Sequence, residues 1–375
     1  MNIAIWGCGK FGKYIFEQLK NKQGYKVIAW VDSNPNKYKG GGKIENLPVI
    51  SNQEVKERMQ IDIDIVLVAF VDSLELLREM SYEKSYRYGF IKERVLHAFL
   101  QLSDNLLEDK NIIWNNSEFI DKPILPTLET NIVDYCNLNC KGCSHFSNLF
   151  NNGDKVPFET FCRDLEQLSQ KVFIGQFNML GGEALLDDKI IEYIVFSRKM
   201  LPYTDITLVT NGVLLPKQTD DFFRCCIEND ILISISGYRP TLQMKDKIQN
   251  VLEKGNVIYG LRDDVIEFGK NIDLSGRADK NMAMQRCRQS KCHFFRNGKL
   301  YKCPFEALGN KFFQYYEIDV CLEGGIDIYD GNINWERVVS QICENPVDAC
   351  RYCGVEEKVE WSVGNSPQVE DWIVN

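Results

Sequence analysis

Three cysteines stand close together in the stretch Leu128–Ser147, which reads LETNIVDYCNLNCKGCSHFS. They are Cys136, Cys140 and Cys143, and their spacing is C-x3-C-x2-C. Thiolates on one such loop can hold three irons of a 4Fe–4S cube, which leaves the fourth iron without a protein ligand. An open iron can bind a small molecule through its amine and carboxylate. A zinc loop is the alternative, but zinc sites usually add a second ligand pair nearby, and none follows here, so the spacing favours iron–sulfur.

Three further motifs follow the cysteine loop in order. They are FNMLGGEALL at 177–186, TNG at 210–212 and ILISISG at 231–237. Together with the cysteines they resemble the radical S-adenosylmethionine (SAM) enzymes, over residues 125–275. In that family the cysteine loop follows the first strand of a partial (β/α) barrel, and a GGE-type motif ends the second strand beside the amino group of SAM. One position departs from the family, because Gly142 stands where many members have an aromatic residue.

The resemblance implies roles for residues at the ends of these strands. Cys136, Cys140 and Cys143 are expected to hold the SAM-binding 4Fe–4S cluster. Contacts to SAM are expected from Gly181, Gly182, Glu183, Asn211, Ser234 and Ser236. Glu183 is expected to orient its motif or to accept from the SAM ammonium, and a plain strand hydroxyl accounts for each serine equally well. Arg262 is a candidate base for a substrate hydroxyl, with an ordinary surface arginine as the alternative.

Four more cysteines have ligand-like spacing in the C-terminal part. Cys287 is followed by ten residues, Gly298, four residues and Cys303, and Cys350 and Cys353 come later in ACRYCG. These four thiolates can close a second 4Fe–4S cube, or equally a structural zinc site. The pattern resembles the twitch extension of radical SAM enzymes and implies one auxiliary cluster. Seven cysteines lie outside the two sets, and most of them are interpreted as small buried hydrophobes: Cys8, Cys162, Cys225, Cys226, Cys292, Cys321 and Cys343.

The N-terminal part contains a glycine motif after a short apolar run. Gly7, Gly9 and Gly12 form G-x-G-x-x-G, and Asp32 ends the next apolar run. Such glycines let backbone amides at a helix start approach an anion, and the acidic residue can meet a ribose hydroxyl. The segment resembles the sugar-nucleotide-binding domains of sugar acyltransferases, and also ordinary NAD-binding halves. A folded domain without a ligand is the alternative, since this fingerprint alone is weak.

Short apolar strands alternate with amphipathic helices, which predicts an α/β fold with parallel sheets. N-terminal strands are expected at 2–6, 27–31 and 61–70, with helical sequence from Phe11 and from Ser73; barrel strands at 128–133, 176–180, 205–210, 231–236 and 257–261; and barrel helices at 158–171, 189–200, 219–228 and 244–254. The expected regions are a Rossmann-like domain (1–105), a linker (106–127), a partial (β/α)6 radical SAM barrel (128–280) and a twitch-like region with the tail (281–375). The acidic tail after Cys353 is interpreted as a solvated surface segment, with packing of Trp361 near the barrel mouth as the alternative.

The composition is that of an ordinary globular protein. Of 375 residues, 44% are hydrophobic and 26% charged, and the net charge is −9. A negative chain without a basic block is a poor partner for DNA or anionic membranes. No apolar run approaches a membrane span, and the first residues lack the basic region and cleavage site of a signal peptide, so a cytoplasmic location is expected.

The two expected clusters favour an oxidation. In radical SAM enzymes an electron from the reduced cluster breaks SAM, and a 5′-deoxyadenosyl radical removes a hydrogen atom from the substrate. Oxidising a secondary alcohol then requires an acceptor for a second electron, and a fully ligated auxiliary cluster is suited to that role. One twitch class oxidises a secondary alcohol of a cyclitol. We therefore expect a carbohydrate or nucleotide-sugar substrate and an electron donor of the flavodoxin or ferredoxin type.

Three alternatives remain at this point. A redox-neutral sugar epimerase would need a hydrogen donor, such as the thiol of Cys225, Cys226 or Cys321. A peptide-modifying maturase is the second, since many relatives with auxiliary clusters modify peptides. The third is a nucleotide-binding protein without enzymatic activity, in which the cysteines hold structural zinc.

Overall fold

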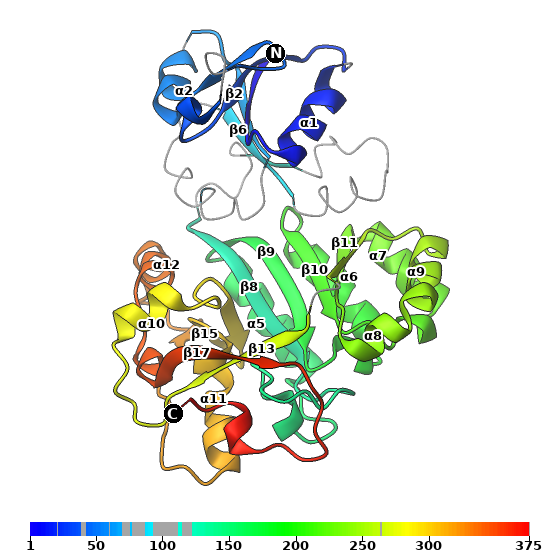
Figure 1. Ribbon diagram of the computed structural model, residues 1–375, viewed down its shortest axis with the longest axis vertical. Coiled ribbons are helices and arrows are strands. Elements are labelled where there is room, and N and C mark those ends of the chain that lie inside the picture. Colours follow the sequence, from blue (N-terminus) through cyan, green and yellow to red (C-terminus); the bar gives the residue numbers. More distant parts are fainter. Residues whose placement is uncertain are drawn as a thin grey trace. The chain divides into compact units, whose positions relative to one another are not determined.

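The computed structural model describes residues 1–20, 22–38, 43–59, 61–69, 76, 87–92, 112–114, 122–262 and 265–374. The chain forms two compact units, Met1–Pro126 and Thr127–Asn375, and each contains a sheet of mainly parallel strands with helices (Figure 1). The helix expected from Ser73 and most of the expected linker 106–127 lie outside the described residues.

A seven-stranded sheet organises the N-terminal unit. Its order is β3-β4-β2-β1-β5-β6-β7, and only the edge strands β3 and β7 pair in antiparallel fashion. The parallel strands follow the order of the doubly wound nucleotide-binding fold. The elements are β1 (Asn2–Trp6), α1 (Lys10–Lys20), β2 (Lys26–Val31), η1 (Pro35–Lys37), β3 (Lys43–Ile44), β4 (Leu47–Ile50), α2 (Asn52–Arg58), β5 (Ile65–Val68), β6 (Arg87–Ile91) and β7 (Ile112–Trp114).

Two sequence expectations change in this unit. The strand expected at 61–70 begins only at Ile65, because residues 61–64 form a turn in which Asp62 pairs with Arg58 at 2.6 Å. Within the stretch expected as a linker, β7 (Ile112–Trp114) is a strand of the first sheet, and the first barrel strand already begins at Ile124.

The glycine turn between β1 and α1 is tightly packed at Gly7 and Gly12. Gly7 has a φ of 127°, and a Cβ built on Gly12 would lie 1.7 Å from the Gly7 carbonyl oxygen. A Cβ built on Gly9 meets no described heavy atom within 4 Å. Gly12 is therefore required by the packing of α1 against the turn, whereas Gly9 leaves the turn open to the approach of a ligand.

The two glycines are expected to respond differently to alanine. Gly12→Ala should destabilise the N-terminal unit by roughly 1–3 kcal/mol, because the new methyl group overlaps the Gly7 carbonyl. Gly9→Ala is the matched control and should stay within about 0.5 kcal/mol of wild type. Amide hydrogen exchange of β1 and β2, followed by mass spectrometry of the full chain, measures both. Equal protection in the two variants would contradict the packing role of Gly12.

An eight-stranded sheet organises the second unit, with the order β12-β11-β10-β9-β8-β14-β15-β16. β9 to β12 run parallel, and β8 ends beside β9, where the Gly182 N–H donates to the Val133 carbonyl at 2.9 Å. Helices connect successive strands, as a (β/α) barrel requires. The strands are β8 (Ile124–Val133), β9 (Phe173–Gly181), β10 (Asp205–Thr210), β11 (Ile231–Ser236), β12 (Tyr259–Arg262), β14 (His293–Arg296), β15 (Lys299–Tyr301) and β16 (Ile326–Asp327).

The C-terminal part is continuous with the barrel. β14 extends the barrel sheet by pairing parallel to β8, and β13 (Glu267–Ile272) pairs with β17 (Cys353–Glu360) in an antiparallel ribbon. Behind them, an aromatic cluster around Phe294, Phe312 and Trp372 also contains Phe146 from the cysteine loop. The region after residue 280 thus shares both a sheet and a core with the barrel.

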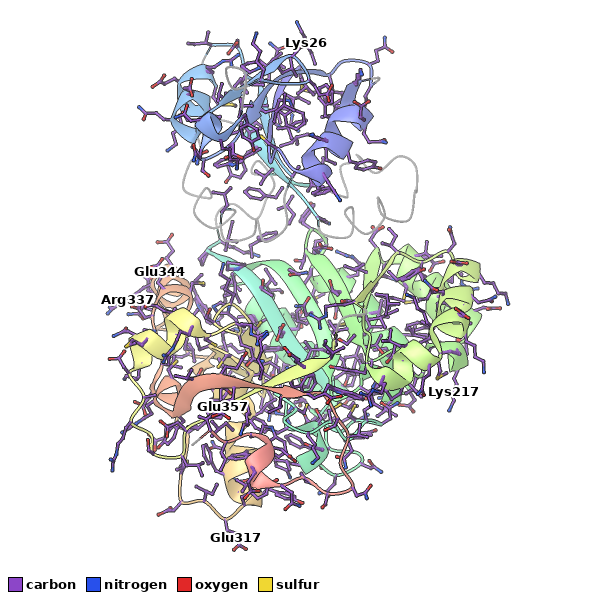
Figure 2. The ribbon with its side chains drawn as sticks, viewed as in Figure 1. Lys26, Lys217, Glu317, Arg337, Glu344 and Glu357 are labelled. Atoms are coloured by element: carbon purple, nitrogen blue, oxygen red, sulfur yellow. The ribbon has the colours of Figure 1, made fainter. Side chains whose placement is uncertain are left out.

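The helices of this unit are η3 (Ser147–Leu149), α5 (Phe158–Ser169), η4 (Ala184–Leu186), α6 (Ile190–Met200), η5 (Leu215–Lys217), α7 (Asp220–Glu228), α8 (Arg239–Gln243), α9 (Lys245–Lys254), α10 (Lys280–Arg286), α11 (Pro304–Tyr315), α12 (Trp335–Glu344), η6 (Asp348–Tyr352) and η7 (Val369–Asp371). Four of them, α5, α6, α7 and α9, match the four that the sequence predicted for the barrel. Charged side chains such as Lys217, Arg337 and Glu357 point outward (Figure 2). None of the helices in the described ranges combines the length and apolar character that crossing a bilayer needs.

Candidate functional site

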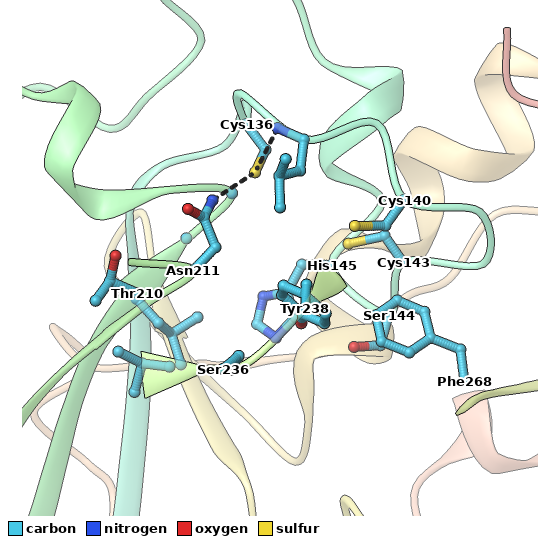
Figure 3. A pocket seen from close by; sticks show the side chains of 15 residues that line it. Cys136, Cys140, Cys143, Ser144, His145, Thr210, Asn211, Ser236, Tyr238 and Phe268 are labelled. Atoms are coloured by element: carbon cyan, nitrogen blue, oxygen red, sulfur yellow. Dashed lines mark hydrogen bonds between the residues drawn. The ribbon is translucent and has the colours of Figure 1, made fainter. Parts of the chain in front are cut away.

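A pocket lies where the parallel strands of the barrel end (Figure 3). The loop after β8, the glycine motif after β9 and the ends of β10 and β11 contribute its walls. Its lining includes the following residues that the sequence predicted: Cys136, Cys140, Cys143, Gly181, Gly182, Asn211 and Ser236. Motifs that are a hundred residues apart therefore meet at one edge of the sheet, as parallel strand ends do.

The cysteine loop presents its three thiols to this pocket. In Figure 3 the sulfurs of Cys140 and Cys143 lie side by side, with Cys136 on another wall. The Cys136 sulfur accepts from the Leu138 N–H at 3.4 Å and from Asn211 Nδ2 at 3.7 Å. Burial raises the pKa of Cys136, and burial with the nearby Cys143 raises the pKa of Cys140 to about 12. Thiolates in this environment need a compensating cation, which a metal cluster supplies.

The two glycines of the GGE motif lie against the cysteine loop. A Cβ on Gly181 would lie 2.2 Å from the Val133 carbonyl oxygen, and a Cβ on Gly182 would lie 1.9 Å from that of Tyr135. The Gly182 and Glu183 N–H groups donate to these same two carbonyls. The glycines are therefore required by the backbone contact that fixes the cysteine loop, and neither carries a side chain that could cover the pocket at this point.

The carboxylate of Glu183 accepts hydrogen bonds from three donors of the chain itself. It is 1% exposed, and its carboxylate accepts from Thr210 Oγ1 at 2.7 Å, the Asn211 N–H at 2.8 Å and the Leu185 N–H at 3.1 Å. Burial raises its pKa, and these donors act in the opposite direction. Of the two roles expected for Glu183, its contacts favour the orientation of the motif.

Ser234 and Arg262 lie beside the pocket without lining it. Ser234 is two residues deeper than Ser236 on β11, with its side chain on the same face of the strand. Arg262 is exposed at the end of β12, and its Nη2 lies 3.5 Å from the Ser236 hydroxyl oxygen. The role of Arg262 as a base stays a prediction.

His145 is a pocket residue that no spacing rule indicated. Its Nδ1 lies 3.1 Å from Asn131 Oδ1, and burial lowers its pKa to about 4. The imidazole is therefore neutral near pH 7 and presents one donor and one acceptor.

The acidic tail is solvated only in part, because Val355 and Val363 are exposed whereas Trp361 and Trp372 are buried. Trp361 stacks on the pocket residue Tyr238, as the alternative interpretation of the tail expected. The Lys141 N–H donates to the Ser362 carbonyl and the Gly364 N–H to the Asn139 carbonyl, both at 3.0 Å. Trp372 Nε1 donates to the Cys143 carbonyl at 2.8 Å. These hydrogen bonds hold the cysteine loop against a segment more than 200 residues away in sequence.

Gly142 is explained by the same contact. It has a φ of +66°, and a Cβ there would lie 2.7 Å from the Asp371 carbonyl oxygen. The aromatic residue that many family members have before the third cysteine would collide with the tail here.

The four C-terminal cysteines also come together. Cys287, Cys303, Cys350 and Cys353 line a small pocket beside Lys302. Burial raises the pKa of all four thiols, that of Cys303 to about 12. Cys303 occupies the N-cap position of α11 without a capping hydrogen bond from its side chain, and the helix dipole favours a thiolate there. Among the described residues no three His, Cys, Asp or Glu side chains close on a single metal ion.

Lys302 brings a buried ammonium to this second thiol set. It is 2% exposed, and its Nζ donates to the carbonyls of Ile342 and Cys343 at the end of α12. A buried ammonium is stabilised by nearby anions, and four metal-bound thiolates would supply them.

A row of polar side chains lies one step deeper in the barrel than the first pocket. Asn178 on β9 pairs in register with Thr207 on β10, and its Nδ2 donates to Glu129 Oε1 on β8 at 3.3 Å. Leu180 and Val209, two residues further along these strands, line the pocket. Because side chains two apart on a strand share a face, the row points to the same side as the pocket.

This row is buried and incompletely paired. Glu129 is 9% and Thr207 3% exposed. Asn178 Oδ1 and Thr207 Oγ1 have no hydrogen-bond partner within the described structure. Burial raises the pKa of Glu129 to about 7, opposed by Asn178 and by a hydrogen bond with Cys292. Burial raises the pKa of Cys292, and this residue is close enough to Cys287 for the charge of that thiolate to raise it further. The row therefore lies between the two thiol sets.

In the N-terminal unit, Asp32 lies at the carboxyl end of β2. Its carboxylate accepts from the Tyr38 hydroxyl at 2.7 Å and the Asn34 N–H at 2.9 Å, and it pairs with Lys37 at 2.8 Å. Burial opposes its ionisation, but these partners outweigh burial, and its pKa is below the ordinary value. A ribose hydroxyl would have to share or displace these partners.

Two family models match the chain. Residues 130–261 match the Radical SAM superfamily, and residues 2–72 match the PglD N-terminal domain. The central part of the chain is therefore a radical SAM domain, and a domain of the PglD type precedes it.

Curated relatives match about a third of the chain. The GTP 3′,8-cyclase of Clostridium acetobutylicum is 25% identical over 140 residues, 34% of this chain and 43% of its own. That of Thermodesulfovibrio yellowstonii is 30% identical over 99 residues, 26% of this chain and 30% of its own. The chain thus spans less than half the length of these relatives.

Solved structures show weaker similarity. BtrN in complex with AdoMet and 2-DOIA is 17% identical, with a TM-score of 0.38 over 60% of this chain and 92% of that one. Native anSMEcpe with bound AdoMet is 17% identical, with a TM-score of 0.31 over 37% of this chain and 43% of that one.

The radical SAM family implies a 4Fe–4S cluster and SAM as cofactors, and the first pocket has groups that fit both. Three thiols that line one pocket, with two N–H donors to the sulfur of Cys136, suit a cluster with one open iron. The glycine backbone, Asn211 and Ser236 offer polar groups for a zwitterionic and ribose-bearing ligand.

The seam between the glycine motif and the cysteine loop can be tested directly. Gly182→Ala should displace the loop, because its methyl group would overlap the Tyr135 carbonyl. SAM cleavage to 5′-deoxyadenosine should fall by roughly 100-fold, as expected for a displacement near 1 Å. Gly331→Ala, at an open position, is the control and should keep wild-type activity. An unchanged rate in Gly182→Ala would contradict the close contact.

Proposed function

We propose that this radical SAM protein oxidises a secondary alcohol of a carbohydrate or nucleotide-sugar-like molecule. The observation that carries the proposal is the buried carboxylate of Glu129, which lies in a polar row between the two thiol sets. An oxidation of this kind needs a base for the hydroxyl proton and acceptors for two electrons, and the chain offers residues for each.

The first thiol set, Cys136, Cys140 and Cys143, would hold the SAM-binding cluster, and the second set would hold an auxiliary 4Fe–4S cluster. When bound, these groups supply hydrogen-atom abstraction from an unactivated carbon and an acceptor for the remaining electron. The glycine backbone and Asn211 would position SAM. The second set supplies four thiols without help from substrate, which suits electron transfer.

Glu129 would accept the proton of the substrate hydroxyl. Its carboxylate is held by Asn178 and Cys292, and its raised pKa matches the task of a base near neutral pH. The unpaired Asn178 Oδ1 and Thr207 Oγ1 would bind neighbouring hydroxyl or amino groups of the substrate. Glu129 is better buried than the exposed Arg262 that the sequence favoured for this role.

A sugar epimerase is the second candidate, and Cys292 favours it. Epimerisation needs a thiol that returns a hydrogen atom to the opposite face of the carbon. The thiols expected for this role are elsewhere: Cys225 and Cys226 are buried on α7, and Cys321 is exposed. Cys292, beside Glu129, is the thiol that meets the polar row.

The N-terminal domain supports a nucleotide-bearing substrate or effector. It has the doubly wound strand order, an open turn at Gly9 and a PglD-type match. Gly7, Gly9, Gly12 and Asp32 would form the binding turn. Calorimetry with UDP-, GDP- and CDP-sugars and NAD tests this, with Gly9→Trp as the variant that blocks the turn.

A substrate screen tests the proposed reaction. Anaerobically reconstituted protein with dithionite should convert SAM to 5′-deoxyadenosine faster in the presence of one member of a panel of cyclitols, amino sugars, nucleotide sugars and GTP. The product should be two hydrogens lighter than its substrate. Cys140→Ala should abolish the reaction, and Cys162→Ala, a half-buried cysteine of α5, should retain it.

Two outcomes would decide between the candidates. A wild-type protein that binds zinc at Cys136, Cys140 and Cys143 and never forms 5′-deoxyadenosine would contradict radical SAM chemistry. A product of unchanged mass with inverted configuration would favour the epimerase, and Cys292→Ala should then convert epimerisation into net oxidation or abortive SAM cleavage.

The role of Glu129 predicts a pH dependence. Its pKa is raised to about 7, so the basic carboxylate form grows as the pH rises through that value. Substrate oxidation should therefore increase from about pH 6 to about pH 8, and Glu129→Gln should flatten this limb and lower kcat by roughly 100-fold. SAM reduction without substrate, measured in parallel, is the control. If the increase in rate with pH persists in Glu129→Gln, the titrating group is another residue.

A further inference from the structure

The C-terminal segment brings a tryptophan to the first thiol set. Trp361 directly follows β17, and its backbone N–H donates to the Ile266 carbonyl at 2.8 Å. Its ring stacks on that of Tyr238, a pocket residue, with centroids 5.2 Å apart and planes 15° apart. Two residues further on, Val363 forms an antiparallel bridge with Cys140. Backbone and ring contacts thus fix Trp361 beside the cysteine loop.

The indole N–H of Trp361 is buried and lacks an ordinary acceptor. The residue is 6% exposed, and Nε1 completes no hydrogen bond of regular geometry within the described residues. It faces the Cys140 sulfur, where its partial positive charge favours the thiolate. A buried donor without a partner is costly, by about 1–3 kcal/mol, which calls for an acceptor in the functional state.

We propose that Trp361 is a positioning residue of the SAM-binding cluster, whose indole N–H donates to the Cys140 sulfur and raises the reduction potential of that cluster. The inference rests on the proposed cluster at Cys136, Cys140 and Cys143. Reduction adds negative charge to the iron and sulfur atoms, so a fixed N–H dipole stabilises the reduced form more than the oxidised one. Neutral thiols do not attract the N–H in this way.

A packing role alone would not explain this geometry. Stacking on Tyr238 needs only an aromatic ring, and phenylalanine supplies one. Trp372 offers a direct comparison, since its indole N–H contacts the same loop but donates to the Cys143 carbonyl oxygen at 2.8 Å. Trp361 is the one of the two whose N–H faces a sulfur.

The potential of the cluster tests the proposal. Wild type, Trp361→Phe and Trp372→Phe are loaded anaerobically with iron and sulfide as full chains. EPR-monitored redox titration follows the signal that changes when SAM is added, because that change identifies the SAM-binding cluster. Trp361→Phe should shift the potential to a more negative value, and by more than Trp372→Phe, whose lost N–H contacts a carbonyl oxygen of the loop and not a sulfur.

An isosteric replacement guards against a packing defect. β-(3-benzothienyl)alanine at position 361 keeps the two fused rings and removes only the N–H, so it should lower the potential as Trp361→Phe does, even if the phenylalanine variant loads poorly. Wild-type potential in the loaded isostere overturns the inference and leaves the proposed function intact. A wild-type protein that assembles no SAM-responsive cluster overturns both.

Discussion

The backbone contact between the ends of β8 and β9 determines where the cysteine loop, the glycine motif and the end of β10 lie. The carbonyls of Val133 and Tyr135 accept hydrogen bonds from Gly182 and Glu183, and the glycines approach so closely that no Cβ fits. Glu183 then reaches from this contact to Thr210 and Asn211 at the end of β10. The cysteine loop, the glycine motif and the next strand end are thereby held as one rigid edge, which gives the thiols and the polar SAM contacts a fixed relation.

The C-terminal part completes this edge from the other side. β17 begins at Cys353, a member of the second thiol set, and ends one residue before Trp361, which faces the first set. Arg296 on β14 forms a bidentate ion pair with the fully buried Asp134, just before the cysteine loop, at 2.7 Å for both contacts. The two thiol sets therefore belong to one folding unit, and the polar row with Glu129 lies between them.

Local sequence patterns predicted the parts of the site that lie at the carboxyl ends of the barrel strands. Strand–helix alternation placed each motif at the carboxyl end of a strand, so the sequence predicted that Cys136, Gly182 and Asn211 lie close together. The pairing of Cys287 and Cys303 with Cys350 and Cys353 followed from spacing in the same way, and the structure brings these four together.

Long-range contacts were not predictable from such patterns. Trp361 lies in an acidic segment with no periodicity, and its partner Cys140 is far away in sequence, so its packing near the barrel mouth was only the alternative to a solvated tail. The role of Glu129 could not be predicted from the strand LETNIV, because a single carboxylate in an apolar strand has no functional signature of its own. Its role depends on its neighbours Asn178 and Cys292, which are distant in sequence. Gly142 departed from its family for a reason that only the tail reveals.

The central claim, that one unit carries two iron–sulfur cubes with different ligand sets, is tested most directly by Mössbauer spectroscopy with iron and zinc analysis of the reconstituted chain. The account predicts about eight irons in wild type, as two cubes of four, and about four irons with no zinc when Cys136, Cys140 and Cys143 are all replaced by alanine. The cube that remains should not respond to SAM. Zinc bound at the C-terminal cysteines, with only about four irons in wild type, would contradict the account.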